Sequence, residues 1–437
     1  MNSSSAIMTR RGLLWTAGGL VTASAFAGLG AACARAEGSA GAGPAPGGAA
    51  PRPEPVKLPR LLASSEPESE KMPAPMAPNK RVGFAIVGLG RLSLEEILPA
   101  FGACKYARPT ALVSGDPDKA RKVAEQYGID PKSIYDYKSY DKIRDDKAVD
   151  AVYIVLPNGM HHEYTIRAAQ AGKHVLCEKP MANTSAECVE MIEACKKANR
   201  KLMIAYRMQY EPYNRQMIKL CRSKALGPVK MIQALNAQTQ GDPNQWRLKK
   251  ALAGGGALPD VGIYCLNATR YLTGEEPIEV IGRVYNTPDD PRFKEVDETV
   301  DFLLRFPSGV LANCSTSYSC HGSKRYRVLG ADGWAEMDPG FPYRGLRMKV
   351  AKKMADHNAN EAAEWQLQEK DQFALEMDHF ARCLLDDKRP HTPGEEGLQD
   401  MRLIEAIYTS GREGKPVKLD PVSGLDAFRG PPPEEEG

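Results

Sequence analysis

The stretch VGFAIVGLGRLS, residues 82–93, carries the clearest structural signal in this chain of 437 residues. Its first half is an apolar run with β-branched residues, which is typical of a buried parallel strand. The run ends at Gly88 and Gly90, and apolar residues at helical spacing follow. Strand, glycine turn and helix make the first unit of a dinucleotide-binding fold, because Gly88 allows the tight turn and Gly90 lets backbone N–H groups approach a pyrophosphate. Ser93 stands where the third glycine of the fingerprint would be.

Strand and helix patterns continue to alternate as far as Tyr206, which predicts an α/β Rossmann domain. The predicted strands cover residues 110–113, 149–156, 174–177 and 202–205, and the predicted helices cover 118–127, 162–171 and 185–198. In such open sheets the ligand lies beyond the carboxyl ends of the strands. The residues at those ends are Gly88, Ser114, Pro157, Glu178 and Tyr206.

After Tyr206, strands of alternating polarity separated by turns predict a C-terminal α+β domain with an open, mostly antiparallel sheet. The predicted strands are 229–237, 279–285, 299–306, 310–318 and 325–329, and the predicted helices are 211–222, 372–385 and 395–413. The predicted organisation is a signal peptide (1–36), an arm (37–80), the dinucleotide-binding domain (81–206), the second domain (207–420) and a tail (421–437). Within the tail, residues 431–436 are expected to be disordered.

Residues 1–36 resemble a twin-arginine export signal. Arg10 and Arg11 precede an apolar segment rich in Ala and Gly, and small residues at 34–36 suit cleavage. The segment lacks the aliphatic density of a membrane span, so no stable membrane insertion is expected. Lipid attachment at Cys33 is a less suitable alternative, because Gly30, three positions earlier, fits a lipid-attachment motif poorly. The remaining alternative is that the Arg-Arg pair occurs by chance before an Ala-rich tail. We expect a periplasmic protein that meets the twin-arginine translocase in its folded state.

Composition excludes some classes of function. The net charge of +3 gives no indication of a nucleic-acid partner. The ten cysteines form no C-x-x-C pair and no zinc spacing, so we expect no metal site and mostly buried free thiols, which fits folding in the reducing cytoplasm. The region 37–80, rich in Gly, Ala and Pro, is either a disordered linker or an extended arm lying on a neighbouring subunit.

The end of the second strand bears on the nucleotide. An acidic residue there normally binds the adenosine ribose of NAD, whereas this chain has Ser114. A neutral hydroxyl with Lys119 one helical turn on suits the 2′-phosphate of NADP. Asp116 is the counter-indication, because it would serve as a ribose acceptor if the strand ended two residues later. We predict NADP.

Two further motifs hold the candidate chemistry. Glu178-Lys179-Pro180 follows a predicted strand in the cofactor crevice, and its proline predicts a fixed, cis or trans, turn that aims the lysine; the alternative is a solvated turn. A glycine run at 254–256 would permit close backbone approach to a ligand. In the helix expected after it, Asp260, Tyr264 and Asn267 are spaced to share one face, which is either solvated surface or the lining of a site.

Together these motifs indicate proton-coupled hydride transfer. Hydride transfer from a sugar hydroxyl needs a base that removes the O–H proton as hydride leaves carbon. A tyrosine with an ordinary pKa of about 10 needs a nearby positive charge to act in this way near neutral pH. We predict that Tyr264 is the acid/base, that Lys179 supplies the charge, and that Asp260 orients the substrate hydroxyls or the pair.

These residues resemble the Gfo/Idh/MocA oxidoreductases. The resemblance rests on Gly88-Leu89-Gly90, on Leu156-Pro157-Asn158 with His161, on Glu178-Lys179-Pro180 and on Asp260-Val261-Gly262-Ile263-Tyr264, and it runs from about Arg81 to the end. Within the family, the chain is most similar to the periplasmic glucose–fructose oxidoreductase branch. The shared features are the export signal, the arm, Ser114 with Lys119, and a tyrosine where many relatives carry histidine.

The resemblance implies a homotetramer formed through the open sheets, with each arm over a neighbour's tightly bound NADP. It implies a ping-pong reaction in which glucose is oxidised to gluconolactone and fructose is reduced to sorbitol. The residues implied at the cofactor are Gly88, Leu89, Gly90, Arg91, Leu92, Ser114, Lys119, Leu156, Pro157, Asn158, His161, Glu178 (at the nicotinamide ribose), Lys179, Arg207, Trp246 and Arg247. Those implied at the sugar are Asp260, Tyr264, Asn267 and Tyr343, with Lys179, Tyr264 and Asp260 as the catalytic set.

The chain departs from the expected pattern at 91–93, 159–160 and 340–344, and the last departure leaves the second sugar open. One alternative is therefore an aldose–aldose oxidoreductase, or an ordinary NADP-dependent sugar dehydrogenase that releases its cofactor. A second alternative is a periplasmic sugar-binding protein without catalysis on the same fold.

Overall fold

The computed structural model describes residues 81–353 and 360–434. The predicted export signal, the arm and the alternative lipid site at Cys33 lie outside the described residues. Within the described ranges, no helix is long and apolar enough to cross a bilayer.

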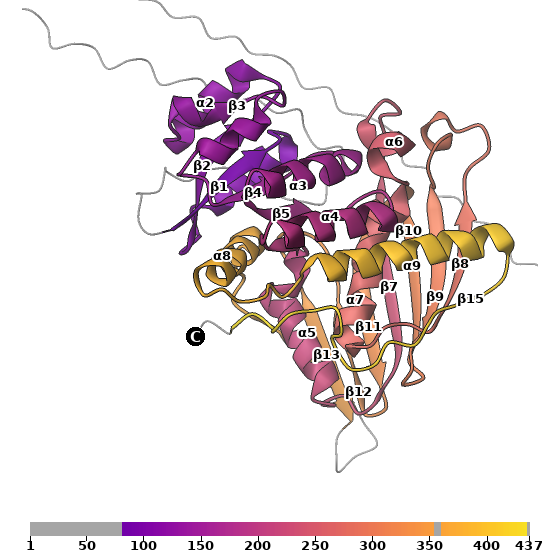
Figure 1. The fold of residues 1–437 in the computed structure, drawn as a ribbon. Coiled ribbons are helices and arrows are strands. Elements are labelled where there is room, and N and C mark those ends of the chain that lie inside the picture. The colour runs from indigo at the N-terminus through magenta and orange to yellow at the C-terminus, as the bar shows by residue number, and fades with distance from the viewer. Residues whose placement is uncertain (1–80, 354–359, 435–437) are drawn as a thin grey trace, which may run out of the picture. The chain divides into compact units, whose positions relative to one another are not determined.

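The N-terminal domain is built on a six-stranded sheet in the order β3-β2-β1-β4-β5-β6 (Figure 1). Its strands are β1 (Val82–Val87), β2 (Ala107–Val113), β3 (Ile134–Tyr135), β4 (Ala151–Ile154), β5 (His174–Glu178) and β6 (Leu202–Ala205), and every pair is parallel. The strand order reverses between β1 and β4, so their carboxyl ends frame the crevice in which open α/β sheets bind ligands. The predicted Rossmann fold is confirmed.

Helices cover both faces of this sheet. They are α2 (Pro117–Tyr127), α3 (His161–Gln170), α4 (Ser185–Lys197) and, from late in the chain, α8 (Gln372–Leu385), with the short α1 (Leu98–Ala100) after a π-helical turn η1 (Ser93–Ile97). Successive strand residues point to opposite faces. Thus Val152 and Cys177 belong to the core that includes α4, whereas Tyr153 and Leu176 belong to the core that includes α8.

The second domain is an open sheet of nine strands in the order β14-β13-β12-β11-β7-β10-β9-β8-β15. The strands are β7 (Val229–Thr239), β8 (Glu279–Tyr285), β9 (Thr299–Arg305), β10 (Leu311–Ser317), β11 (Ser319–Gly330), β12 (Gly333–Met337), β13 (Met348–Lys353), β14 (Asn360–Trp365) and β15 (Val417–Lys418). All neighbours are antiparallel except β7 and β10. This confirms the predicted mostly antiparallel sheet.

Helices α5 (Pro212–Arg222), α7 (Ile263–Thr273) and α9 (Gly394–Glu413) lie along one face of this sheet (Figure 1), and the short α6 (Lys250–Ala253) precedes the glycine run. The alternation in β9 fits a half-covered sheet, because Val300, Phe302 and Leu304 are buried while residues 301, 303 and 305 are exposed. The other face therefore remains open in a single chain.

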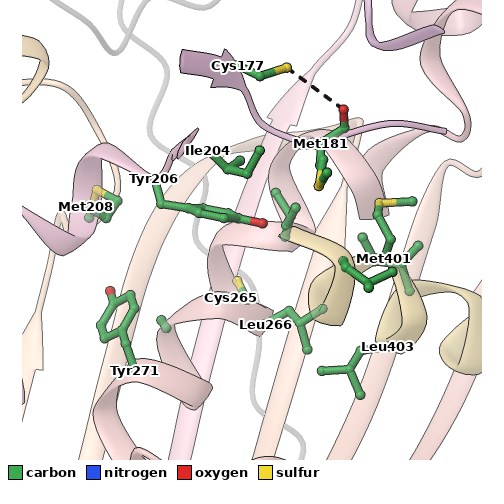
Figure 2. Close-up of a cluster of buried hydrophobic side chains, with 14 of the residues drawn as sticks. Cys177, Met181, Ile204, Tyr206, Met208, Cys265, Leu266, Tyr271, Met401 and Leu403 are labelled. Atoms are coloured by element: carbon green, nitrogen blue, oxygen red, sulfur yellow. Dashed lines mark hydrogen bonds between the residues drawn. The ribbon is translucent and has the colours of Figure 1, made fainter. Parts of the chain in front are cut away.

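One core joins the two domains. Figure 2 shows Ile204 and Tyr206, at the end of β6, beside Cys265 and Leu266 of α7 and Met401 of α9. These side chains are buried, so the carboxyl end of the parallel sheet is fixed against the helices that carry the second half of the site.

Two parts of the second domain differ from the prediction. Strands β12, β13 and β14 were not predicted, because their polar and charged residues, such as those at 349, 352 and 361, obscure the alternation. The end of the chain, treated as a tail, is anchored as far as it is described. Arg429 is buried and donates to Glu396 at 2.8 Å, and Glu434 lies 3.0 Å from Lys388.

Candidate active site

The glycine turn has the geometry expected of a nucleotide cradle. Gly88 has φ +98°, and a Cβ there would lie 2.5 Å from the carbonyl oxygen of Val155, so only glycine fits. Around Gly90, by contrast, a Cβ would meet no heavy atom within 4 Å, which leaves room for a phosphate. Ser93 is buried, and its hydroxyl donates to the Gly88 carbonyl at 2.5 Å. The serine therefore stabilises the turn in addition to permitting close packing.

The residues beside the turn divide by exposure. Leu89 is buried, whereas Arg91 is half-buried and donates to Glu95 at 2.7 Å. Leu92 is also half-buried and packs against the core under α8. Their predicted contacts with the cofactor stay predictions.

The end of β2 fits a 2′-phosphate better than a ribose diol. The Ser114 hydroxyl accepts from the Asp116 N–H at 3.1 Å, which leaves its proton to donate elsewhere. Asp116 caps α2 by accepting from the Lys119 N–H at 3.0 Å, so its carboxylate serves the helix. Sequence reasoning missed Tyr137, whose ring a Cβ at Gly115 would meet at 3.2 Å. Its position just after β3, the neighbour of β2, was the available signal.

Asn158 and His161 support the turns of the site. Both side chains are buried, and the Asn158 amide donates to the carbonyl of Ala253 at 2.9 Å. The two ring nitrogens of His161 face the carbonyls of Leu156 and Pro180 at 2.8 and 2.9 Å. Burial lowers the pKa of His161. This ring therefore ties the end of β4 to the turn after β5, and its predicted contact with the cofactor stays a prediction.

The central contacts join the two domains. The Lys179–Pro180 peptide bond is cis. Lys179 Nζ donates to the Asp260 carbonyl at 2.6 Å and to its Oδ1 at 3.1 Å, and it lies 4.8 Å from the centre of the Tyr264 ring. The structure thus brings together the three predicted catalytic residues: Lys179 follows β5, Asp260 lies in the segment before α7, and Tyr264 lies in the first turn of α7.

Asp260 is held by three donors. Besides Lys179, Arg247 Nε donates to its Oδ2 at 3.2 Å and the Tyr318 hydroxyl at 2.5 Å. Burial alone would raise the pKa of Asp260, but the charges of Lys179 and Arg247 outweigh burial and hold this pKa well below its usual range. Burial alone would lower the pKa of Lys179, yet the combined effect of Tyr264, Asp260 and neighbouring charge raises it. At neutral pH the pair is a cation and an anion.

Tyr264 lies between two cations. The Arg207 guanidinium is 5.0 Å from the centre of its ring, and the Phe341 ring lies 6.1 Å away. Arg207 itself is buried, donates to the Phe341 carbonyl at 2.7 Å and lies 4.4 Å from the ring of Tyr343. It also contacts Gln372. These contacts place Arg207 behind Tyr264, so it supports the predicted base; its predicted contact with cofactor stays a prediction.

The helical stripe is not regular. Residues 258–262 form a π-helix, η7 (Leu258–Gly262), and α7 begins at Ile263, so Asp260 leaves the line of Tyr264 and Asn267. Tyr264 and Asn267 still line one small cavity, together with Lys179. Asn267 is buried, and its amide donates to Glu396 and Asp400, each at 2.9 Å.

Packing requires the glycine run, and its predicted role in ligand approach stays a prediction. A Cβ at Gly255 would lie 2.3 Å from the Tyr408 hydroxyl, and one at Gly256 only 1.9 Å from the carbonyl of Asp297. The Asp297 carboxylate accepts from the Gly256 N–H at 2.6 Å and from the Leu258 N–H at 2.9 Å. Asp297, Tyr318 and Tyr408 were all missed, since only the folded chain brings these distant residues to this segment.

Trp246 and Arg247 lie in a short 3₁₀ turn, η6 (Trp246–Leu248). The Arg247 guanidinium stacks 4.5 Å from the centre of the Trp246 ring while it contacts Asp260.

Glu178 is 8% exposed and accepts from the Tyr153 hydroxyl at 2.8 Å. Glu178 is therefore held at the carboxyl end of β5, directly before Lys179.

Comparison with known proteins identifies a family for both domains. A family model described as an oxidoreductase family with an NAD-binding Rossmann fold matches residues 82–206. A second model, the GFO/IDH/MocA C-terminal domain, matches residues 214–336.

Several characterised proteins are similar to the chain over most of its length. The NADP-dependent D-xylose 1-dehydrogenase of Haloarcula marismortui is 34% identical over 353 residues, which cover 79% of this chain and 95% of that protein. A second such dehydrogenase, from Haloferax volcanii, is 30% identical over 77% of this chain and 99% of that protein. The crystal structure of an aldose–aldose oxidoreductase from Caulobacter crescentus, in complex with glycerol, is 48% identical with a TM-score of 0.74, and the match covers 78% of this chain and 100% of that one.

Proposed function

Because this chain belongs to the Gfo/Idh/MocA family of oxidoreductases, we propose that it oxidises an aldose at its anomeric carbon and passes the hydride to a second sugar through a retained NADP. The cofactor, when bound, supplies the site that accepts and returns the hydride. The chain's own residues bind the nucleotide, orient the sugar and move its proton.

The observation that carries this proposal is the contact of Lys179 with both Asp260 and Tyr264. Tyr264 takes the sugar O–H proton during oxidation and returns one to the second sugar during reduction. Lys179 keeps a positive charge beside the tyrosine ring, and Asp260 fixes the ammonium with a bond of 3.1 Å. A sugar-binding protein without catalysis would have no need of a buried lysine fixed beside a tyrosine.

The nucleotide is NADP in this proposal. The free donor of Ser114, the cation of Lys119 and the use of Asp116 as a helix cap together suit a phosphate at the adenosine ribose. The two similar xylose dehydrogenases are NADP-dependent by name.

In this proposal the second sugar, which accepts the hydride, is an aldose. The similar Caulobacter protein is an aldose–aldose oxidoreductase, and the segment 340–344 departs from the glucose–fructose pattern. The glucose–fructose cycle, with gluconolactone and sorbitol as products, is the second candidate. It is favoured by the export signal and arm of residues 1–80.

We further propose export to the periplasm by the twin-arginine pathway and assembly into a homo-oligomer, a tetramer by family resemblance. The motif at Arg10 and Arg11 supports the first. The open sheet face supports the second, because Met231, Leu303 and Leu311 are between 39% and 47% exposed on it.

The test is to purify the protein and follow nicotinamide absorbance without added cofactor. Glucose should produce the reduced form, and a second aldose should then return it to the oxidised form. Reoxidation by fructose alone would favour the glucose–fructose cycle, whereas turnover only with added NADP would favour an ordinary dehydrogenase. A bound nucleotide that no aldose reduces would contradict the proposal.

A further inference from the structure

Two buried carboxyl groups meet at one tyrosine hydroxyl beside the site. The Tyr153 hydroxyl oxygen lies 2.8 Å from Glu178 Oε1 and 2.9 Å from Glu376 Oε1. Tyr153 and Glu376 are fully buried, and Glu178 is 8% exposed. The three side chains come from β4, α8 and the end of β5, on the face of the sheet that α8 covers.

The number of protons follows from these distances. A phenol carries one hydrogen, so Tyr153 donates to one carboxylate only. A second carboxylate at 2.9 Å would have to share that hydrogen and would keep its own charge buried, which is costly. A carboxylic acid in its place brings a hydrogen of its own and donates it to the phenol oxygen, so this arrangement favours one protonated glutamate.

The surrounding charges decide which glutamate is protonated. Lys179 and Arg207 face Glu178, and both favour its anionic form. Glu376 faces the negative charges of Glu178 and Asp371, with Arg207 as the opposing cation. Burial raises the pKa of both groups, and that of Glu376 rises well above its ordinary value. The second oxygen of Glu376 is buried without a hydrogen-bond partner, which a neutral acid tolerates better than a carboxylate.

We propose that a protonated Glu376 donates to Tyr153, that Tyr153 donates to Glu178, and that the Glu178 carboxylate so held favours the oxidised nicotinamide over the reduced one. This inference rests on the proposed NADP-dependent function. The oxidised ring carries a positive charge that the reduced ring lacks. Glu178 is buried and directly precedes Lys179, whose ammonium lies beside the Tyr264 ring. A carboxylate in that position stabilises the charged, oxidised nicotinamide more than the neutral, reduced one. Glu376 and Tyr153 are positioning residues in this arrangement.

A carboxylate of this kind has a use in a cycle that keeps its cofactor. A retained nucleotide must be reduced by one sugar and oxidised by the next, so neither form can be bound much more tightly than the other. The fixed charge of Glu178 adjusts that balance, and the buried acid behind it keeps the charge from being lost to protonation.

The experiment measures the ratio of the dissociation constants for NADP⁺ and NADPH, by quenching of protein fluorescence, in the full chain and three variants. Glu178→Gln should shift the ratio about tenfold toward NADPH, because it removes the negative charge proposed to favour the oxidised ring. Tyr153→Phe should shift it in the same direction by less, because Glu178 loses a donor. Glu376→Gln should change the ratio less than about twofold, since its amide N–H₂ donates as the acid does.

Infrared spectroscopy of the protein without nucleotide locates the proton independently. The carbonyl stretch of a protonated carboxyl group should be lost in Glu376→Gln and kept in Glu178→Gln. The opposite infrared pattern, or an unchanged ratio of the two dissociation constants in Glu178→Gln, would overturn this inference and leave the proposed function standing. If Glu178→Gln does not fold, Tyr153→Phe carries the same test. Failure of the wild-type protein to bind either nucleotide would overturn the proposed function as well.

Discussion

Lys179 and Asp260 are 81 positions apart in the chain, and the ammonium of the first lies 3.1 Å from the carboxylate of the second. The lysine follows a parallel strand of one domain, and the aspartate precedes a helix of the other. Their contact therefore reports on how the two domains meet, and Tyr264, whose ring centre is 4.8 Å from the ammonium, lies beside that junction.

Loss of either member of the proposed catalytic pair should nearly abolish turnover. Lys179→Ala removes the charge beside Tyr264, and Tyr264→Phe removes the acid/base, so each should lower the rate by about 10²–10⁴-fold. NADP should remain bound in both, as absorbance after purification would reveal. Lys196→Ala, at an exposed position of α4, is the control and should keep full activity. Normal turnover in both site variants would refute the assignment.

Asp260 should contribute to stability as well as to catalysis. Asp260→Ala leaves Lys179 and Arg247 without their shared carboxylate in a site where the aspartate is only 17% exposed, so the free energy of unfolding should fall by about 2–3 kcal/mol. Urea unfolding measures this. Glu364→Gln, which removes an exposed partner of Arg347, should leave stability unchanged. Equal effects of the two substitutions would contradict the buried role of Asp260.

Nucleotide preference should follow the end of β2. Ser114→Asp places a negative charge where the 2′-phosphate is proposed, and Lys119→Ala removes a positive one. Each substitution should weaken the binding of NADP by about 10- to 100-fold relative to the binding of NAD, as expected for charge-assisted hydrogen bonds worth roughly 1.5–3 kcal/mol. Lys122→Ala, at an exposed position of the same helix, is the matched control. Unaltered NADP affinity in both variants would mean that the phosphate lies elsewhere.

Stability should fall as the pH drops below about 6.5, because of His379. Burial, reinforced by His391, lowers the pKa of His379 to about 3, while its unfolded value is about 6.5. A depressed pKa means that the contribution is complete above the unfolded pKa and is lost as pH falls toward the folded one, by about 2 kcal/mol at pH 5.

A hydrogen bond adds to the effect of burial. His379 Nε2 accepts from the His391 N–H at 2.9 Å, which a protonated ring cannot do. His379→Gln supplies an amide oxygen as acceptor and should reduce the loss of stability between pH 7 and pH 5. Denaturant midpoints at the two pH values measure it. A variant with the same pH dependence as the wild type would exclude His379 as its source.

Local sequence predicted the parallel sheet correctly, and it singled out Lys179, Asp260 and Tyr264, which the structure brings close together. The run at 82–93 specifies strand, turn and helix by its own residues, and Ser93 could be recognised as a small residue in the glycine position. Lys179 and Tyr264 lie in short motifs that can be recognised from adjacent residues alone. These features depend on residues adjacent in the chain.

What sequence could not predict depends on contacts between distant segments. Tyr318 reaches Asp260 only because the end of β10 lies beside the η7 segment in the folded chain, and Glu376 reaches Tyr153 across 223 positions. The π-helical segment before Ile263 breaks the regular spacing on which the predicted polar stripe relied. The glycine run has a packing role for the same reason, since Asp297 and Tyr408 come from elsewhere in the chain.

The most direct test of the central claim follows a single hydrogen. Purified protein, without added nucleotide, is given glucose deuterated at C1 and then an unlabelled second aldose. If the hydride passes through a retained nicotinamide, deuterium should appear first on the bound cofactor and then at C1 of the reduced aldose, with none drawn from solvent. Deuterium that never reaches the second sugar, while that sugar is reduced with solvent hydrogen or only when free NADP is supplied, would contradict the account.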